Sequence, residues 1–546
     1  MEACGGWGSR LWGPTGPPTR PSAAGYPRAV TRARLLLSAA LVALLVGARL
    51  AWAPGLLGAE GGEVFGHAWV QWWHAEALPG WPDGPGSWLV QPRAWPVIDP
   101  LPTLLSALLT RVAGLTTGWN AVMLGGVVLA FVGGADLARR SGGDPTVGGL
   151  ALALAPALMG SAASGLTEDL AVGLVALALS RVGDADWRQG ALAGVLLGIL
   201  AWCGLLLAWM AGLAAVALGV GAVLRDRSRW RGLIAGAAAA AVISAPAALL
   251  QGDRLDGAGH RAGQLMERAE PLWRLNPWRG VDLASFLVPG AMDPGDALVR
   301  MHPGYLGLSL LGLAVVGRWS RWWAVLAAVV VLAPGPRLAW MGTPLDLDNP
   351  AVSILHAIPL GDLVNHHGRL LLLGAVALSV LAARGAARVP VRWRMAVGGL
   401  VAMDLAALSP LPLPLPTTPH EPLAVTACTD RPCVDDLSPG GLLELPLAGP
   451  GVHFQRPLLQ QPFHRRPVLA NPNRPGLPAS AGRTDSGRWL GSLALPEPAP
   501  SPQRFEPPEG VSVLVSRDPA TIERLAAVLG APDIERGATA AWDVGR

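Results

Sequence analysis

Apolar residues in this chain fall in long runs rather than alternating with polar residues, a pattern that predicts helices crossing a membrane. Eleven such runs are expected to be spans. They lie at residues 35–52, 117–138, 147–163, 166–180, 190–203, 205–224, 233–250, 304–316, 322–333, 370–383 and 395–408. The sequence therefore predicts a mainly α fold, a polytopic membrane helical bundle of about 11 transmembrane helices.

The run 190–224 is too long for one span. Its 35 residues in a single helix would be about 52 Å long, whereas the hydrocarbon core is about 30 Å thick. Arginines flank it on both sides, and both flanks should lie in the cytoplasm, so an even number of passes lies between them. We expect a tight hairpin that turns near Gly204. Gly190, Gly194 and Gly198 have the spacing of small residues that lets helices pack closely.

The arginines also orient the bundle. All basic residues are arginines, and those before residue 35 place the amino terminus in the cytoplasm. Eleven passes then put the remaining arginine clusters on the same side. The loops 53–116, 251–302 and 334–369 and everything after residue 410 are expected on the outer face.

Three regions are predicted along the chain. Residues 1–33 are rich in Gly, Pro and Arg and should form a disordered basic cytoplasmic tail, followed by the multi-pass domain at 34–410. Residues 411–546 begin with a proline-rich linker and continue as a small extracytoplasmic α/β domain. Its expected strands are 441–447, 511–516 and 539–544, and its expected helix is 519–529, with Asp518 as cap and Pro519 in the first turn.

Composition narrows the function classes. Of 546 residues, 51% are hydrophobic and 15% charged, which argues against a soluble enzyme. A formal charge of +4 is too small and too scattered to indicate nucleic-acid binding. Cys428 and Cys433 are close enough for a small disulfide if their segment lies outside the cytosol, and they lack the second pair of ligands that a zinc site requires.

The first outer loop contains the segment around which the chemistry is expected. Winding residues 63–78 as a helix puts Glu63, His67, Gln71 and His74 on one side and Phe65, Trp69, Trp72 and Trp73 on the other. An aromatic face suits a helix lying in the membrane interface. The polar face is either a catalytic or ligand-binding surface, or only the water-facing side of a helix that anchors the chain in the membrane interface.

Several polar groups are candidates for chemistry on the outer face. The carboxylates of Glu60 and Glu63 could deprotonate a hydroxyl acceptor or hold a divalent cation against a phosphate leaving group, and equally could only begin the helix. Two or three possible ligands on one helix are a weak metal signal, so no metal site is expected. Glu168 and Asp169 stand in a short outer turn, where helix capping by Ser164 or Thr167 is the plain alternative.

The tenth span opens with a second group of polar residues. Asn365, His366, His367 and Arg369 precede it, and a guanidinium there could clamp a phosphate or extend to lipid headgroups. Asp404, inside the last span, needs a partner that the sequence does not identify.

Together these segments resemble the GT-C superfamily of membrane glycosyltransferases, in particular its YfhO-like bacterial branch. The resemblance lies in Glu63, His67, Trp72 and Trp73 of the first loop, and in short motifs later in the chain. These are LVQPRAWP at 89–96, the segment 100–109, YLGL at 305–308, NHHGRL at 365–370, GLLELPL at 441–447 and QQPFHRRPVLA at 460–470.

The resemblance implies a reaction and a place for it. Such enzymes transfer a sugar from a polyprenyl-phosphate-linked donor to a glycan, lipid or protein acceptor on the outer side of the bacterial cytoplasmic membrane. It implies that Glu63 is the first-loop catalytic acid, that Glu168 or Asp169 is a second-loop acid, and that Arg369 lies near the donor phosphate. Glu60 is a further catalytic candidate because of its place where the chain leaves the bilayer. The remaining substrate-binding residues are then expected to be His67, His74, Arg93, His366 and His367.

One departure leaves alternatives open. The family usually has Asp where this chain has Glu63, and one extra methylene moves the reacting oxygen by more than about 1 Å. A non-enzymatic protein that binds or transports lipid-linked glycans therefore remains an alternative, as does a scaffold whose outer domain recruits a protein partner.

Overall fold

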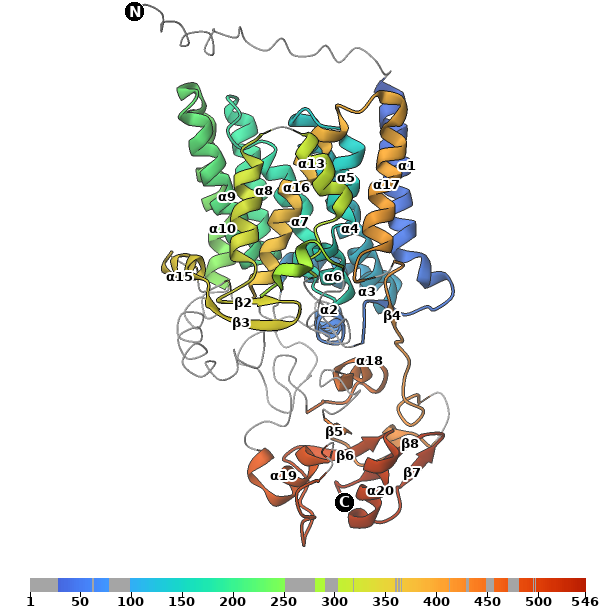
Figure 1. The fold of residues 1–546 in the computed structure, drawn as a ribbon. Coiled ribbons are helices and arrows are strands. Elements are labelled where there is room, and N and C mark those ends of the chain that lie inside the picture. Colours follow the sequence, from blue (N-terminus) through green and yellow to red (C-terminus); the bar gives the residue numbers. More distant parts are fainter. Residues whose placement is uncertain are drawn as a thin grey trace, which may run out of the picture.

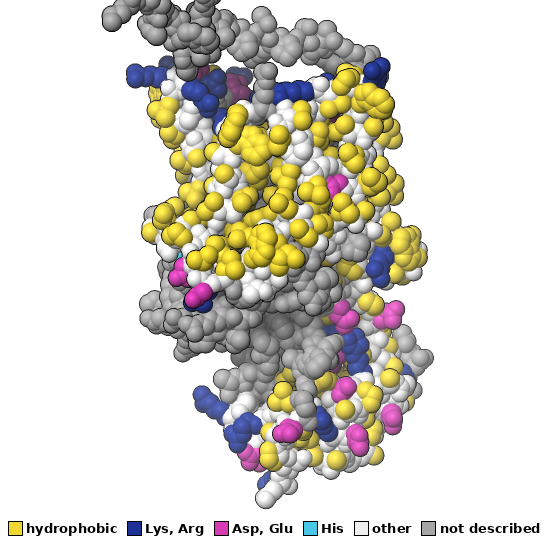
Figure 2. Space-filling model, viewed as in Figure 1, with side chains coloured by type: hydrophobic (Ala, Val, Ile, Leu, Met, Phe, Trp, Pro, Cys, Tyr) yellow, Lys and Arg dark blue, Asp and Glu magenta, His cyan; other side chains and the backbone are white. Residues whose placement is uncertain are grey.

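The computed structural model has a helical bundle at one end and a smaller α/β region at the other (Figure 1). It describes residues 28–60, 63–77, 99–250, 280–289, 303–317 and 319–546. The last range excludes 359–360, 362–363, 365, 412, 429–431, 448–455, 470–480, 494 and 496. Arginine side chains gather at the end of the bundle opposite the carboxyl-terminal region (Figure 2).

A helix is present in each of the eleven segments expected to span the membrane. These are α1 (Arg28–Gly47), α4 (Leu115–Arg140), the broken pair α5 (Pro145–Ala153) and α6 (Pro156–Ala163), α7 (Val172–Leu179), α8 (Trp187–Cys203), α9 (Leu205–Val223), α10 (Trp230–Leu250), α13 (Leu308–Val316), α14 (Trp322–Leu332), α16 (Leu371–Ala386) and α17 (Arg394–Ala407). Five described helices are long and apolar enough to cross a membrane, or six if the bent pair counts as one span. The chain thus has the helices of a membrane protein, and the number of passes stays a prediction.

The predicted disordered tail is too long at its carboxyl end. Helix α1 begins at Arg28, so residues 28–33 are helical, while 1–27 lie outside the described residues. The physical reason is that arginine is a good helix former whose long side chain can reach the headgroups from a helix that continues into the bilayer.

The run 190–224 forms two helices, α8 and α9, that meet at Gly204 as the flanking charges indicated. The glycines of α8 face α10. A Cβ built on Gly194 would lie 2.0 Å from the carbonyl oxygen of Gly236, and one on Gly190 would lie 2.1 Å from that of Gly232. Only a residue without a side chain allows this approach, so the spacing serves helix packing.

The segment between the first two bundle helices, which the sequence predicts to be an outer loop, contains two helices, and its packing corrects the expected membrane-interface helix. Helix α2 (Val64–Ala77) is buried on both faces: Trp69 is 0% exposed and Trp73 6%, while His67 is 2% exposed. The indole Nε1 of Trp69 donates to Oε1 of Gln461, 2.8 Å away in the carboxyl-terminal region. The aromatic face is therefore covered by protein, because the end of the chain folds back over it.

Helix α3 (Pro100–Ala113) follows and has the reverse of a soluble helix's polarity. Thr103, Ser106 and Thr110 are buried, whereas Leu104 and Leu108 are exposed. Leucines facing outward and hydroxyls facing inward suit a helix that contacts lipid. The sequence did not predict this helix as a separate element.

The segment between α14 and α16 contains a hairpin and a helix. Strands β2 (Arg337–Trp340) and β3 (Thr343–Asp348) pair antiparallel, and α15 (Pro350–Ala357) follows with Asn349 as its cap. A short helix, η6 (Leu283–Phe286), lies against the hairpin, because Asp282 accepts from the backbone N–H groups of Met341 and Gly342.

The carboxyl-terminal region is built on a four-stranded sheet in the order β5-β6-β8-β7. The strands are β5 (Gly441–Leu445), β6 (Val511–Ser516), β7 (Ile534–Arg536) and β8 (Thr539–Asp543); β5 and β6 are parallel and the other pairs antiparallel. Helix α20 (Pro519–Leu529) is capped by Asp518, as the sequence predicts. Strand β7 and helix α19 (Asp485–Ser492) were not predicted, since both are short and largely polar.

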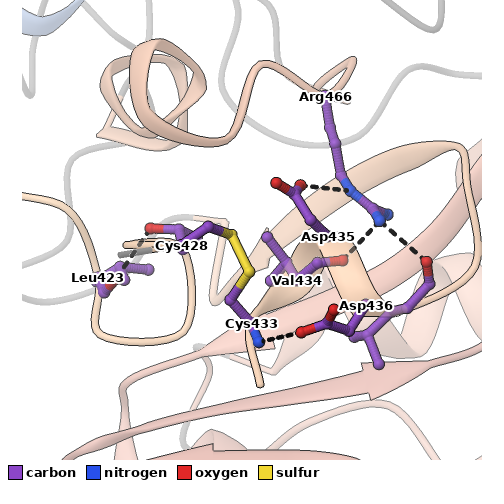
Figure 3. Close-up of a disulfide and its surroundings, with 9 residues drawn as sticks. Leu423, Cys428, Cys433, Val434, Asp435, Asp436 and Arg466 are labelled. Atoms are coloured by element: carbon purple, nitrogen blue, oxygen red, sulfur yellow. Dashed lines mark hydrogen bonds and ion pairs between the residues drawn. A yellow bond between two sulfur atoms is a disulfide. The ribbon is translucent and has the colours of Figure 1, made fainter. Parts of the chain in front are cut away.

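Two features tie this region together. Cys428 and Cys433 form a disulfide (Figure 3). Arg466 donates to the carbonyl oxygens of Val434 and Leu437 beside it, at 2.5 and 3.1 Å. The region is also joined to the bundle, because β1 (Leu56–Leu57) pairs antiparallel with β4 (Thr417–Thr418) across more than 350 residues of sequence.

Candidate functional site

Four segments bring ionisable groups together at the end of the bundle that faces the carboxyl-terminal region (Figure 1). They are the start of α2, the residue before α3, the short helix η3 (Thr167–Ala171) and the short helix η8 (His367–Leu370). The backbone N–H of Glu63 donates to the carbonyl oxygen of Ser164, 2.7 Å away, which fixes α2 against the turn before η3. We call the side chains of Glu63, His67, Asp99, Glu168, Asp169 and Arg369 the acid–arginine cluster.

Arg369 lies between the two acids of η3. Its Nη2 is 3.0 Å from Oε1 of Glu168, and its Nε is 3.9 Å from Oδ2 of Asp169. Asp169 also accepts from the hydroxyl of Ser161 at 2.8 Å. The exposed fractions of these side chains are 16% for Arg369, 13% for Glu168 and 2% for Asp169. Charged groups that are this deeply buried need partners of opposite charge. The guanidinium of Arg369 and the two carboxylates neutralise one another.

A second set of contacts runs from Glu63 to Asp99. The Nε2 of His67 lies 3.3 Å from Oε2 of Glu63, and its Nδ1 lies 3.1 Å from the hydroxyl oxygen of Thr167. The hydroxyl of Thr167 donates to Oδ2 of Asp99, and that of Thr103 donates to Oδ1 at 2.8 Å. Since Thr167 gives its one proton to Asp99, Nδ1 of His67 must be the donor to Thr167.

These contacts set the protonation of the pair. Burial alone would lower the pKa of His67, but the hydrogen bond to Glu63 and the charges of Glu168 and Asp99 outweigh it and raise the pKa to about 9. Burial would raise the pKa of Glu63, but His67 and the charges of Arg369 and His366 bring it to about 2. At neutral pH the pair is therefore an imidazolium beside a carboxylate.

Asp99 differs from Glu63. Its side chain is 1% exposed, and burial together with the charge of Glu168 raises its pKa to about 6. The side chain of Glu63 is 45% exposed. Glu63 is thus the member of the acid–arginine cluster that a substrate could reach most readily, while Asp99 supports His67 through Thr167.

The structure brings together five of the candidates that the sequence singled out: Glu63, His67, Glu168, Asp169 and Arg369. The other candidates lie in different settings. His74 is close to the carbonyl oxygen of Val70 in its own helix, at 2.8 Å. The buried ring of His367 lies 5.5 Å from that of His356. His366 acts on the pKa of Glu63 by its charge, and Arg93 lies outside the described residues.

The sequence did not predict the part played by Asp99, a member of the acid–arginine cluster, or by Thr167, which links Asp99 to His67. Asp99 precedes Pro100, a pattern that indicates a helix cap, yet its side chain makes no capping hydrogen bond. Thr167 and Ser164 were expected as possible caps for η3, but the N-cap residue is Leu166, with no side-chain capping bond. An aspartate before a proline and a threonine before two acids are the signals that could have marked them.

Asp404 also acquires its partners. Its Oδ1 accepts from the hydroxyl of Tyr305 at 2.7 Å, and its Oδ2 accepts from the backbone N–H of Ser309 at 2.7 Å. This joins α17 to the start of α13 and accounts for the charge as a structural one.

His67, Asp99 and Glu168 have ligand atoms within 4.8 Å of one another and could hold a cation. Glu168 Oε2 is buried without a hydrogen-bond partner among the described residues, which fits such a group. The imidazole would first have to lose a proton, because a metal ligand must be neutral. A divalent ion here would supply positive charge beside the acids.

Glu60 lines a separate cavity of about 290 Å³ between the first loop and the carboxyl-terminal region. It forms an ion pair with Arg456 at 2.9 Å, and His420, Gln460 and Arg517 also line the space. Phe65 lines it as well, so the cavity comes within two residues of Glu63 along the chain. Its polar walls suit a hydroxyl-rich molecule.

Comparison with known proteins shows what the fold resembles. No family model and no curated protein matches the sequence. The arabinofuranosyltransferase AftD from mycobacteria is similar in structure, with a TM-score of 0.50 and 16% identity over 89% of this chain. This chain spans 36% of AftD's length.

Two further solved structures are weaker matches. The Archaeoglobus fulgidus oligosaccharyltransferase has a TM-score of 0.45 and 13% identity, covering 89% of this chain and 69% of its own. ArnT from Cupriavidus metallidurans, bound to undecaprenyl phosphate, has a TM-score of 0.40 and 14% identity, covering 94% of this chain and 97% of its own. These neighbours are GT-C superfamily glycosyltransferases. The similarity to AftD shows that this chain shares its fold.

Proposed function

We propose that the protein is a membrane glycosyltransferase that moves a sugar from a polyprenyl-phosphate-linked donor to an acceptor on the outer side of the cytoplasmic membrane. The observation that carries the proposal is the acid–arginine cluster, in which one exposed carboxylate and one arginine stand at the end of an apolar bundle. The GT-C-like fold and its similarity to AftD, an arabinofuranosyltransferase, support it. The YfhO-like branch and the 11-pass topology, with a cytoplasmic amino terminus, are part of the same proposal.

Glu63 is the proposed general base. It is ionised at neutral pH and is the most exposed acid of the acid–arginine cluster. Its ion pair with His67 holds the carboxylate in place, and a pKa of about 2 makes it a weak base while the pair is intact. Approach of the acceptor hydroxyl must therefore loosen the His67 contact for proton transfer to become efficient.

Arg369 is the proposed contact for the donor phosphate. A guanidinium has five N–H donors, and the contacts of Arg369 with Glu168 and Asp169 use Nη2 and Nε. The remaining donors can bind phosphate oxygens as the leaving group gains charge. Glu168 and Asp169 then orient the guanidinium rather than take part in the chemistry.

The step balances as follows. The acceptor oxygen forms a bond to the anomeric carbon of the sugar, and the bond from that carbon to the phosphate oxygen breaks. The hydroxyl proton passes to Glu63, and the polyprenyl phosphate leaves with one more negative charge, beside Arg369. The cavity lined by Glu60 and Arg456 is the proposed place for the acceptor, because it adjoins α2 and is polar.

The test is transfer by the purified protein in proteoliposomes that contain polyprenyl phosphate carrying radiolabelled pentose or hexose. Incorporation of label into an acceptor extracted from the cell envelope supports the proposal. Donor that binds without turnover for every sugar and acceptor offered would instead indicate a lipid-glycan binding protein. Mass analysis of envelope glycans from a deletion strain would name the acceptor.

A further inference from the structure

A second polar cavity lies at the opposite end of the bundle from the acid–arginine cluster. It has a volume of about 490 Å³, within the range of about 300–1,000 Å³ typical of ligand sites. Among the described residues, five arginines line it and no acid does. They are Arg140, Arg225, Arg229, Arg321 and Arg384. We call the space that they line the arginine cavity.

These arginines come from separate parts of the chain. Arg140 ends α4, Arg225 and Arg229 lie in the turn between α9 and α10, Arg321 precedes α14, and Arg384 is in the last turn of α16. Charge bias alone places arginines at helix ends on this side. It does not require them to converge on one hollow, and their convergence is the feature to be explained.

Some of these charges are already balanced. Arg140 lies 3.3 Å from Asp136 and 3.9 Å from Asp184, and Arg229 lies 3.0 Å from Asp226. Arg225 donates to the carbonyl oxygen of Gly221 at 2.8 Å. This caps the end of α9 without neutralising the charge.

The other two arginines have no such contact. Within the described part of the chain, the guanidinium groups of Arg321 and Arg384 make no hydrogen bond or ion pair, although the backbone carbonyl of Arg321 accepts from Ala324. Burial lowers the pKa of Arg321, and the like charges of Arg225 and Arg229 lower it further. Three guanidinium groups so close repel one another, and an anion between them would remove the repulsion.

The surroundings indicate what kind of anion fits. Leu137, Leu179, Ala222 and Trp322 form an apolar wall of the cavity beneath the arginines. Trp319, at its mouth, is 90% exposed, and an exposed indole at a bundle end is typical of the headgroup level of a bilayer. A ligand with a charged phosphate and an apolar part next to it would match both the arginines and the apolar wall.

We propose that the arginine cavity binds the phosphate of an anionic ligand on the side of the membrane opposite the acid–arginine cluster, with an anionic phospholipid headgroup as the expected source. Basic pockets between membrane helices bind such headgroups through charge and bidentate guanidinium contacts. The site is independent of the proposed transfer reaction, since its residues lie at the other end of the bundle.

The test compares the wild type with the double variant Arg321→Gln/Arg384→Gln in nanodiscs of phosphatidylglycerol or of phosphatidylcholine. Lipid retained after detergent extraction is counted by native mass spectrometry, and the melting temperature is recorded for both lipids. The wild type should retain phosphatidylglycerol, and the double variant should bind it more weakly by about fivefold per arginine removed. Arg392→Gln, an exposed arginine at the same end that does not line the cavity, should behave as the wild type.

Two further arms distinguish the source and guard against misfolding. Inorganic pyrophosphate is titrated against the wild type in a neutral detergent, and a melting-temperature rise that the double variant lacks would assign the phosphate to a soluble ligand. Arg321→Lys/Arg384→Lys should recover part of the binding if charge is the cause. Equal retention of both lipids by the wild type, with no response to pyrophosphate, would overturn the proposal.

Discussion

Arg369 and Glu168, two hundred residues apart in the sequence, form an ion pair of 3.0 Å at the end of the helical bundle. Both side chains are largely buried, and Asp169 stands 3.9 Å from the same guanidinium. The ion pair joins η3 to η8 and so fixes Arg369 beside Glu168 and Asp169. Its energetics can be measured apart from any activity.

Removing Arg369 should destabilise the protein, because two buried carboxylates would lose their partner. We expect Arg369→Gln to cost about 3–5 kcal/mol of unfolding free energy. The double variant Arg369→Gln/Glu168→Gln should recover part of that loss, since one stranded charge is gone. Thermal unfolding followed by tryptophan fluorescence gives the coupling, and purely additive effects would contradict a direct ion pair.

His67 should make stability depend on alkaline pH. Its pKa is raised to about 9, so the stabilisation from its charged form is complete below its unfolded pKa of 6.5 and is lost as the pH rises through about 9. The wild type should therefore lose melting temperature between pH 7 and 10 more steeply than His67→Gln does. His74→Gln is the matched control, because His74 lies in the same helix outside the acid–arginine cluster, and it should keep the wild-type profile.

Glu444 should also make the carboxyl-terminal region less stable as the pH rises, but nearer to neutral pH than His67 does. The carboxyl is buried in β5, and burial raises its pKa from 4.5 to about 7. Stability is then full below pH 4.5 and is lost as the pH rises through about 7, by about 3 kcal/mol at most. Glu444→Gln should raise the melting temperature more at pH 8 than at pH 5. An equal change at both values would show that the pKa of Glu444 is the same in the folded and the unfolded protein.

The contact between α8 and α10 can be tested with one methyl group. Gly194→Ala places a Cβ 2.0 Å from the carbonyl oxygen of Gly236, so the helices must separate and the melting temperature should fall. Gly212→Ala in α9 is the control. A Cβ there meets nothing within 4 Å, and alanine favours a helix by about 1 kcal/mol over glycine. A fall of equal size in both variants would contradict close packing at Gly194.

The sequence predicted those elements that depend on local patterns. The apolar runs located the bundle helices, the flanking arginines located the turn at Gly204, and the capping pattern at Asp518 and Pro519 located α20. Local rules such as helix capping, residue spacing and charge bias were sufficient for these.

What the sequence did not predict depends on contacts between distant segments. Burial of α2 under the carboxyl-terminal region needs the pairing of Leu56 with Thr418, which no local pattern indicates. The part played by Asp99 was hidden for the same reason: a residue that resembles a helix cap bonds instead to Thr167, 68 positions later. Glu63, His67, Glu168, Asp169 and Arg369 were each identified, but their convergence was an inference from the predicted outer face.

Glu63 is proposed to take the proton of the acceptor hydroxyl. The most direct measurement is the turnover of radiolabelled polyprenyl-phosphate sugar by Glu63→Gln in proteoliposomes, beside the wild type and Glu60→Gln. Loss of a general base should lower the turnover number by about 10²–10⁴-fold, with donor binding retained. Glu60→Gln should weaken acceptor binding but reduce the turnover number far less, because Glu60 lines the proposed acceptor cavity and is paired with Arg456 outside the acid–arginine cluster. Turnover by Glu63→Gln equal to that of the wild type would contradict the account.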